Sequence, residues 1–143
     1  MTTAVLDTGV LVPGIFWRHE PYRCVQAWAR GLLTMAVSDG IFSEYQRVLQ
    51  EVKAEQGFTT DLEPWLESIR KTALWVVPTP LAKPVCRDPK DDIMIEAALA
   101  AGARTIIARD PDLTVLEKPF GIRILTPRAW LATLSRADRR RLL

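Results

Sequence analysis

The chain has few of the residues that build zinc sites or disulfide scaffolds. Its 143 residues contain two cysteines and one histidine, without metal-ligand spacing. Zinc chemistry and a disulfide framework are therefore poorly supported, and Cys24 and Cys86 are expected to be free buried thiols. Neither a phosphate-binding P-loop nor a dinucleotide-binding glycine fingerprint is present, which argues against nucleotide-driven group transfer.

Long apolar runs are also missing. No run reaches the about 18 residues that suggest a membrane-spanning helix. Asp7 interrupts the N-terminal segment before the apolar region of a signal peptide could form, so we expect a cytoplasmic protein with no membrane partner. Nearly half of the residues are hydrophobic, enough for one sizeable core. We expect residues 1–143 to form a single domain.

Neither sign of charge dominates. The sequence has 19 basic and 17 acidic residues, a balance that does not favour strong nonspecific adhesion to nucleic acid. Charge is uneven along the chain, however. Arginines crowd the C-terminus from Arg136 to Arg141, where a solvated last helix or a frayed tail is the simplest interpretation. The acidic residues that cluster are Asp88, Asp91, Asp92, Asp110 and Asp112.

Short apolar strands alternate with segments of helical periodicity. Ser38 is a candidate helix N-cap, Thr60 and Glu63 resemble a capping box, and Gly102 is predicted to end the helix before it. The alternation predicts an α/β fold with a mostly parallel central sheet and helices on both faces. The predicted strands are 4–6, 35–37, 74–77, 104–108 and 122–125, and the predicted helices are 10–17, 21–30, 41–52, a segment running from Pro64 towards Ala73, 91–101 and 126–134.

Two aspartates follow directly on predicted strands. Asp7 ends the first strand, and Asp110 ends the strand that begins at Arg104. Ligands of open parallel sheets bind beyond the carboxyl ends of the strands, so both side chains would face one crevice if those strands are neighbours. For each residue taken alone, a turn or a helix cap is the preferred interpretation, and the other acids shift the balance towards a shared site.

Three further acidic residues extend this pattern. Glu44 lies at the edge of the apolar stripe of the 41–52 helix, from where it could lean into a cleft or pair with Arg47 at the surface. Asp91 and Asp92 open an apolar helix, whose dipole favours negative charge. Together with Asp88 they exceed what capping needs. Carboxylates gathered in a cleft raise one another's pKa unless cations compensate.

A carboxylate pocket without histidine or cysteine suits hard cations such as Mg²⁺ or Mn²⁺. Such sites commonly serve phosphoryl chemistry, because the ion stabilises charge on the phosphate and activates water. Hydrolysis of a phosphodiester therefore fits the sequence better than nucleotide-driven transfer.

Four blocks, in order and spacing, resemble PIN-domain ribonucleases, particularly the toxin components of toxin–antitoxin pairs (VapC-like). The resemblance implies divalent-metal-dependent hydrolysis of RNA, with water as the nucleophile. It also implies an antitoxin protein as partner, and we expect a homodimer. The blocks are Val5–Val12, Val37–Leu49, Arg87–Ala98 and Thr105–Leu113, the last followed by Gly121–Pro127.

Carried onto this chain, the resemblance assigns the catalytic carboxylates. Asp7 and the acidic residue of the third block would hold the principal ion, and Glu44 and Asp110 would orient water or a second ion. Whether Asp91 or Asp92 faces the metal is left open by the sequence. The predicted catalytic residues are Asp7, Glu44, Asp91 and Asp110, the predicted metal ligands are Asp7, Asp91, Asp92 and Asp110, and the supporting candidates are Thr8, Ser38 and Asp112.

Two positions depart from the family pattern. Gly9 replaces the asparagine usual after Asp-Thr, and Ala108 replaces the threonine or serine common two residues before the fourth acid. Both changes remove a polar group without removing a carboxylate. A PIN-like module that binds RNA or protein without cleaving is therefore an alternative, since a fold alone does not establish function.

A more distant alternative comes from Asp7-Thr8-Gly9, which also resembles the active-site triplet of retroviral-type aspartic proteases. Those enzymes are all-β dimers, which the helical periodicity of 41–52 and 91–101 contradicts. Most of the five tryptophans are expected in the core or in interfaces. Trp17 and Trp28 are the pair expected to face a partner.

Overall fold

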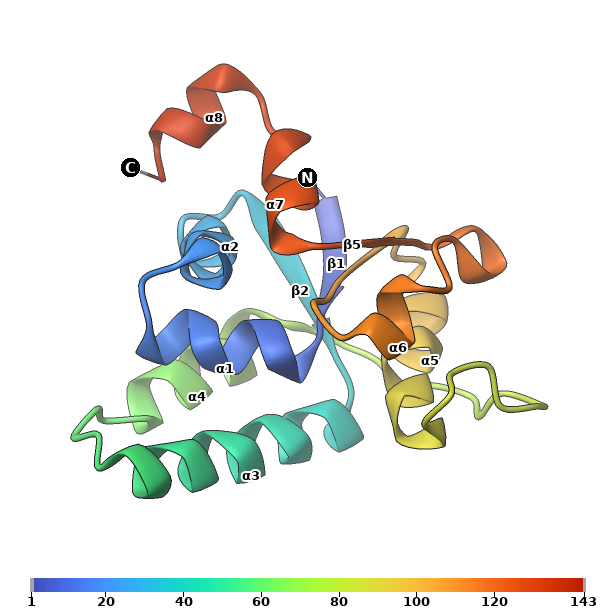
Figure 1. Ribbon diagram of the computed structural model, residues 1–143, viewed down its shortest axis with the longest axis horizontal. Coiled ribbons are helices and arrows are strands. Elements are labelled where there is room, and N and C mark those ends of the chain that lie inside the picture. The colour runs from blue at the N-terminus through green and yellow to red at the C-terminus, as the bar shows by residue number, and fades with distance from the viewer. Residues whose placement is uncertain (1, 143) are drawn as a thin grey trace.

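The computed structural model describes residues 2–142, whose centre is a five-stranded sheet in which every pairing is parallel. The strand order is β3-β2-β1-β4-β5. Helices cover both faces of this sheet (Figure 1), so the predicted α/β architecture is confirmed and the all-β protease alternative is excluded. The strands are β1 (Thr2–Leu6), β2 (Leu33–Val37), β3 (Leu74–Trp75), β4 (Thr105–Ile107) and β5 (Arg123–Leu125).

The central strand β1 lies between two partners because it is apolar on both faces. Ala4, Val5 and Leu6 are fully buried, as expected for a parallel strand covered by helices on each side. Ala4 aligns with Met35 of β2, and Leu6 aligns with Ile107 of β4. The residue that follows the strand, Asp7, therefore lies at the carboxyl end of the sheet, in its centre.

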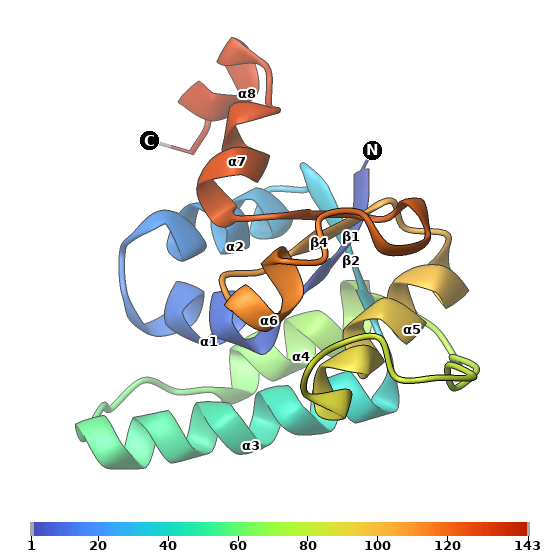
Figure 2. The same ribbon diagram turned by 45° about the vertical axis from the view of Figure 1, so that its right-hand side comes forward.

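Helices of different length form the two outer layers. Helices α1 and α2 lie on one side of the sheet, and α5 lies on the other side against β1, β2 and β4 (Figures 1 and 2). None of the helices within residues 2–142 is long and apolar enough to cross a membrane. The helices are α1 (Thr8–Phe16), α2 (Glu20–Ala29), α3 (Asp39–Gln56), α4 (Glu63–Thr72), α5 (Asp92–Ala101), α6 (Pro111–Thr114), α7 (Pro127–Ala132) and α8 (Arg136–Arg140), with 3₁₀ turns η1 (Pro89–Asp91) and η2 (Pro119–Gly121).

A buried glycine lets α1 and α2 approach closely. A Cβ atom at Gly14 would lie 2.7 Å from the carbonyl oxygen of Pro21 and 2.4 Å from a methyl group of Val25. No side chain larger than hydrogen fits there without moving backbone. Gly14 therefore brings the second half of α1 against the first turn of α2.

Helix ends agree with the sequence prediction at two positions and differ at a third. The Ser38 hydroxyl accepts a hydrogen bond from the Ile41 amide at 3.3 Å, and Gly102 ends α5 with φ of +63°. The predicted capping box at Thr60 is wrong, because the residue at the N-cap of α4 is Leu62. The polar contact at this helix start comes from Asp61, whose carboxylate accepts from the Glu63 amide at 3.2 Å.

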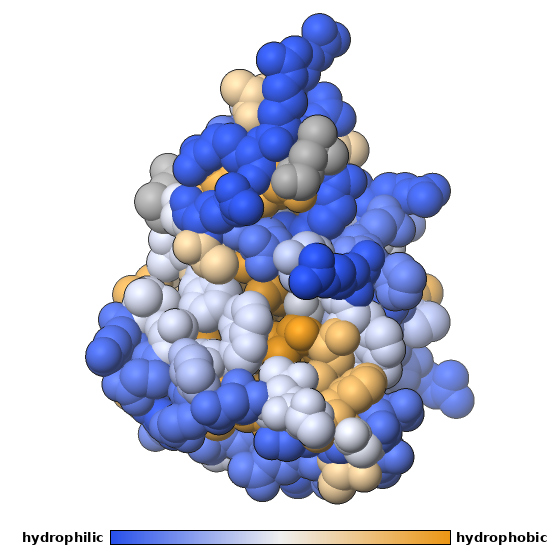
Figure 3. All heavy atoms as spheres, turned by 90° about the vertical axis from the view of Figure 1, so that its left-hand side faces the viewer, coloured by the Kyte–Doolittle hydropathy of each residue, from blue (hydrophilic) through white to orange (hydrophobic). Residues whose placement is uncertain are grey.

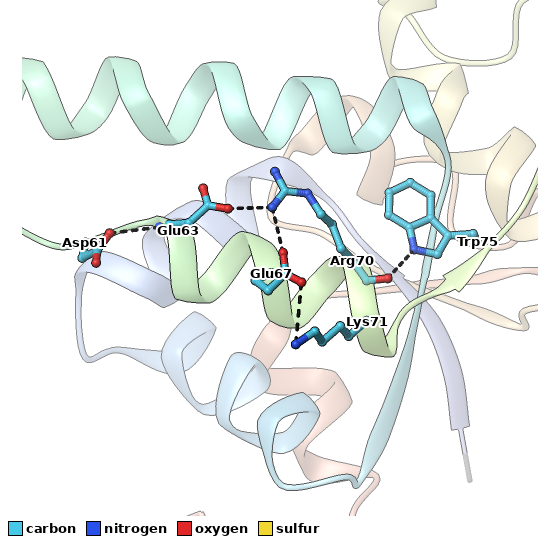
Figure 4. A network of polar contacts seen from close by, with 6 residues as sticks. All are labelled: Asp61, Glu63, Glu67, Arg70, Lys71 and Trp75. Atoms are coloured by element: carbon cyan, nitrogen blue, oxygen red, sulfur yellow. Dashed lines mark hydrogen bonds and ion pairs between the residues drawn. The ribbon is translucent and has the colours of Figure 1, made fainter.

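The edge strand β3 is shorter than predicted and is fastened to α4. Only Leu74 and Trp75 have strand geometry, although the Val76 amide still donates to the carbonyl of Val37 at 2.9 Å. The Trp75 indole N–H donates to the carbonyl oxygen of Arg70 at 3.0 Å (Figure 4). The C-terminal arginine run forms α8, a short exposed helix at one end of the molecule, in keeping with a solvated last helix.

Candidate functional site

The order in which the chain adds strands to the sheet reverses between β1 and β4, which makes this place a topological switch point. Strands β2 and β3 lie on one side of β1, whereas β4 and β5 lie on the other. Such a switch point opens a crevice at the carboxyl ends of the two strands. Asp7 follows β1 and its amide donates to the Ile107 carbonyl of β4 at 2.9 Å, and Asp110 stands three residues beyond Ile107.

An open pocket of about 590 Å³, called the acid pocket below, occupies this crevice. Four carboxylates from four different parts of the chain line it, and they are the four that the sequence predicts as catalytic. β1 leads into Asp7, α3 carries Glu44, η1 ends at Asp91, and the segment after β4 contributes Asp110. The parallel topology thus brings together acids that are widely separated in sequence.

Two consecutive residues of α3 attach this helix to the end of β1. The Thr8 hydroxyl donates a short hydrogen bond to a carboxylate oxygen of Glu44. The hydroxyl of the fully buried Tyr45 donates to the carbonyl of Leu6. The contacts of Thr8 and Tyr45 therefore fix the position of Glu44 relative to Asp7. The surface pairing considered for Glu44 is not formed, since Arg47 pairs with Glu51 at 3.1 Å.

The structure separates the roles of Asp91 and Asp92. Asp91 lines the acid pocket, whereas Asp92 is 6% exposed and does not line it. The Asp92 carboxylate accepts hydrogen bonds from the backbone amides of Val85 at 3.1 Å and Cys86 at 2.8 Å. Asp92 thus secures the proline-rich loop onto α5, and its prediction as a metal ligand does not agree with this geometry.

The other supporting candidates divide in the same way. Ser38 is buried and caps α3, so it does not extend the polar lining of the pocket. Asp112 lies beside the pocket: carboxylate oxygens of Asp91, Asp110 and Asp112 all fall within 4.8 Å of one another. The backbone amide of Asp112 donates to the Asp110 carboxylate at 2.9 Å, which sets the orientation of this pair.

Burial and mutual repulsion raise the pKa of two of these acids. The pKa of Asp7 is raised from 3.8 to about 6, chiefly by burial and then by the negative charges of Asp110 and Glu44. The pKa of Asp91 is also raised to about 6 by burial, followed by the charges of Asp110, Asp7, Asp88 and Glu44. Carboxylates that oppose one another's ionisation form an environment that a cation would relieve.

The chemistry of the donor set fits a hard divalent cation. All charged ligand candidates in the pocket are carboxylate oxygens, the ligand type that Mg²⁺ and Mn²⁺ prefer. Cys86 approaches the cluster but is buried, and burial together with the neighbouring Asp92 raises the pKa of its thiol, so it is no thiolate ligand. Cys24 is likewise a free buried thiol, as predicted.

The two departures from the family pattern lie at different depths. A Cβ atom at Gly9 would lie 3.5 Å from a carboxylate oxygen of Asp7, so an asparagine there would place its amide beside this acid without a clash. Ala108 is fully buried, and its amide donates to the Leu125 carbonyl of β5 at 2.9 Å. Of the two, Gly9 therefore has the more direct effect on the polar lining.

One lining residue was not predicted from the sequence. Arg109 lies at the pocket, and its Nε donates to the carbonyl oxygen of Gly9 at 3.0 Å. This carbonyl would normally accept from the amide of residue 13 within α1, but Pro13 has no N–H. The proline four residues after Gly9 is thus the sequence signal that a carbonyl is free for another donor. It does not reveal which donor takes the place.

The five tryptophans are only partly as expected. Trp28 and Trp130 are buried, so the prediction that Trp28 faces a partner is wrong. Trp17 is half-buried and packs edge-on against Phe16 and Phe58, with ring centroids 6.0 and 5.5 Å apart.

Comparison with known proteins agrees with the geometry. A family model described as "PIN domain" matches residues 3–112, most of the chain and all four pocket carboxylates. No curated protein matches the sequence. PIN domains are generally nucleases, which is the class of enzyme that an all-carboxylate pocket at a sheet switch point suits. This chain belongs to the PIN-domain family.

Proposed function

We propose that this protein is a divalent-metal-dependent ribonuclease that hydrolyses RNA phosphodiester bonds with water as the nucleophile. The observation that carries the proposal is the gathering of Asp7, Glu44, Asp91 and Asp110 in one pocket at the switch point of a PIN domain. The raised pKa values of Asp7 and Asp91 support it, because burial and then the neighbouring negative charges oppose the ionisation of both acids, and a bound cation would relieve this.

Each carboxylate has a proposed role. Asp7 and Asp91 would hold the principal ion, Mg²⁺ or Mn²⁺, and Glu44 and Asp110 would orient the attacking water or a second ion. When bound, the metal supplies charge neutralisation on the phosphate and lowers the pKa of water. Thr8 keeps Glu44 in place through its hydrogen bond, and Asp112 is an outer candidate ligand beside Asp110.

The test is cleavage of a labelled single-stranded RNA with Mn²⁺ or Mg²⁺, with and without a chelator. We expect cleavage that the chelator stops and that Asp110→Asn abolishes. Asp61→Asn is the matched control, since Asp61 is an exposed acid at the start of α4 that does not line the acid pocket. Binding of Mn²⁺ without cleavage would favour the alternative of a noncatalytic PIN-like binding module, for which Gly9 and Ala108 are the supporting departures.

We further propose that the protein is the toxin of a toxin–antitoxin pair with a protein antitoxin as partner. A band of apolar and weakly polar surface among hydrophilic residues supports this, on the face where α1 and α3 end (Figure 3). Induced expression should arrest growth in the wild type and not in Asp110→Asn. Normal growth at a verified level of active enzyme would refute the toxin role.

A homodimer is the remaining proposal on partners. Its support is the exposed apolar edge of the sheet, where Leu74, Trp75 and Val77 are 41%, 39% and 95% exposed. Sedimentation at micromolar concentration should give twice the monomer mass, and Val77→Glu should shift it towards the monomer. A wild-type monomer under these conditions would contradict the dimer.

A further inference from the structure

A second, smaller pocket adjoins the acid pocket and shares one residue with it. This neighbouring pocket has a volume of about 290 Å³ and is lined by Pro13, Trp17, His19, Pro21 and Arg109. Arg109 also lines the acid pocket. A ligand that extends from the carboxylates along the Arg109 side chain would therefore reach the neighbouring pocket.

Arg109 is held at this boundary by a contact that leaves its outer nitrogens available. Its Nε donates to the carbonyl of Gly9 at 3.0 Å, the carbonyl that Pro13 leaves without a helical donor. Within residues 2–142 no carboxylate forms an ion pair with Arg109. It is also the one basic residue among the described residues that line the acid pocket. An anion brought towards the carboxylates thus meets a positive charge at this point.

Trp17 also lines the neighbouring pocket, and its ring is packed against two other aromatic rings. The amide of Trp17 donates to the carbonyl of Pro13 at 2.9 Å. The Trp17 ring packs edge-on against Phe16 and Phe58, at interplanar angles of 72° and 75°. The close packing at Gly14 holds Pro21 against the same stretch of α1. Because the Trp17 ring is already held in place, it would lose little further conformational entropy when a flat partner stacks on it.

We propose that the neighbouring pocket binds the base of the nucleotide next to the scissile phosphodiester, with the base on Trp17 and the adjoining phosphate on Arg109. This inference rests on the proposed ribonuclease function and adds a substrate subsite to it. The occupant is single-stranded RNA, since a base must leave its helix to stack on a protein ring. Aromatic stacking together with an arginine contact to the backbone is the usual chemistry of such binding.

The position of the two pockets favours a nucleotide over other ligands. The acid pocket repels free anions, so a phosphate that is drawn to Arg109 must be retained by a second contact. The Trp17 ring, which lines the neighbouring pocket together with Pro13, Pro21 and His19, offers that contact to a base. Stacking also tolerates any base, so the subsite would position RNA without imposing a strong sequence preference.

The test measures kcat and KM for a short single-stranded RNA with one cleavage site. Trp17→Leu and Arg109→Gln should each lower kcat/KM by about 10-fold or more, mainly through KM, as expected for the loss of a base stack or a phosphate contact. Matched controls are Trp65→Leu, a half-buried tryptophan of α4, and Arg104→Gln, an exposed arginine before β4. Both controls should cleave as the wild type does.

A substrate with an abasic sugar isolates the stacking. Placed in turn on each side of the scissile bond, it should lower wild-type kcat/KM at one position and add no further loss to Trp17→Leu there. Thermal unfolding identifies a Trp17 variant that fails to fold, and the exposed Arg109 then provides the independent measurement. If the abasic sugar lowers kcat/KM of Trp17→Leu as much as it lowers that of the wild type at both positions, the subsite is overturned.

Two outcomes separate the subsite from the enzyme. If the wild type cleaves RNA and both pocket variants cleave equally well, the subsite is wrong and the ribonuclease stands. If the wild type does not cleave, anisotropy of the labelled RNA with Mn²⁺ present still measures binding. A 10-fold weaker affinity of both variants would then support the subsite, and equal affinity would overturn it.

Discussion

Two groups of acidic residues in this protein differ in how their charge is balanced. On α4, the Arg70 guanidinium lies 2.8 Å from Glu63 and 3.2 Å from Glu67, and Lys71 lies 3.7 Å from Glu67 (Figure 4). All these side chains are exposed. In the acid pocket, Asp7 and Asp91 face other carboxylates, and burial and repulsion raise the pKa of both.

The difference is between negative charge that is paired at the surface and negative charge that is left for a ligand, as the proposed function requires. Exposed ion pairs contribute little to stability, since water and salt screen them. A partly buried group of like charges lowers the stability of the fold, and it is retained where a ligand of opposite charge offsets the cost. The charges of the α4 network are balanced within the protein, whereas we propose that a bound cation balances those of the pocket.

The largest expected effect is on activity. Asp7→Asn should lower kcat for RNA cleavage by about 1,000-fold or more, because Asp7 is a proposed ligand of the metal, which would contribute several kcal/mol of charge stabilisation. Glu63→Gln makes the same type of change in the α4 network and should leave kcat unchanged. Equal losses in both variants would remove the distinction between the two groups.

The second effect is on stability as a function of pH in metal-free protein. Native Asp7 keeps its proton up to a pKa of about 6, whereas the unfolded chain releases it near 3.8. Between these values the native state binds more protons, so stability falls as pH rises. Asp7→Asn removes this dependence and should be more stable than the wild type at pH 8 by up to about 3 kcal/mol.

Chemical unfolding of both proteins at pH 4 and pH 8 measures this gap. The stability of Asp7→Asn minus that of the wild type should be near zero at pH 4 and positive at pH 8. A gap that is already present at pH 4 would point to a packing effect of the amide instead of to ionisation.

Addition of Mn²⁺ should reverse the same penalty. A metal at about 100 times its Kd stabilises the native state by about 2.7 kcal/mol, seen as a higher Tm at neutral pH. The increase should be lost in Asp110→Asn and kept in Glu67→Gln on α4. An unchanged Tm of the wild type at millimolar Mn²⁺ would count against a cation in the pocket.

The smallest effect is expected on α4 itself. Arg70→Met removes the cation shared by Glu63 and Glu67, and its exposed position predicts only a slight loss of stability that high salt abolishes. Urea unfolding at low and high salt measures it. A large loss that persists in high salt would instead assign the effect to the Arg70 contact with the Phe42 ring, 5.3 Å from its centroid.

The fold was predictable because its signals are local and repeated. Apolar strands such as Ala4–Leu6 and the cap at Ser38 report directly on the structure that forms. Errors arose where the signal depends on one side chain among several candidates. Asp61 makes the contact at the start of α4 that Thr60 was expected to make, and the short α6 carries too few residues for a period.

The site was predictable as a set of acids and less so as individual roles. Parallel topology explains why Asp7 and Asp110 meet, but Asp91 and Asp92 point about 100° apart on a helix, and only tertiary contacts decide between them. The amides of Val85 and Cys86 bind Asp92. Arg109 was missed because its partner, the carbonyl of Gly9, becomes available through a proline elsewhere in the chain.

The pairing of β1 with β4 has a consequence for how the protein is made. Asp7 and Asp110 are separated by about one hundred residues, which a ribosome adds in about 5 to 20 seconds. During this interval the nascent chain has β1 without the neighbour that completes the acid pocket. A growing polypeptide therefore lacks the full set of proposed catalytic carboxylates until most of its length has emerged.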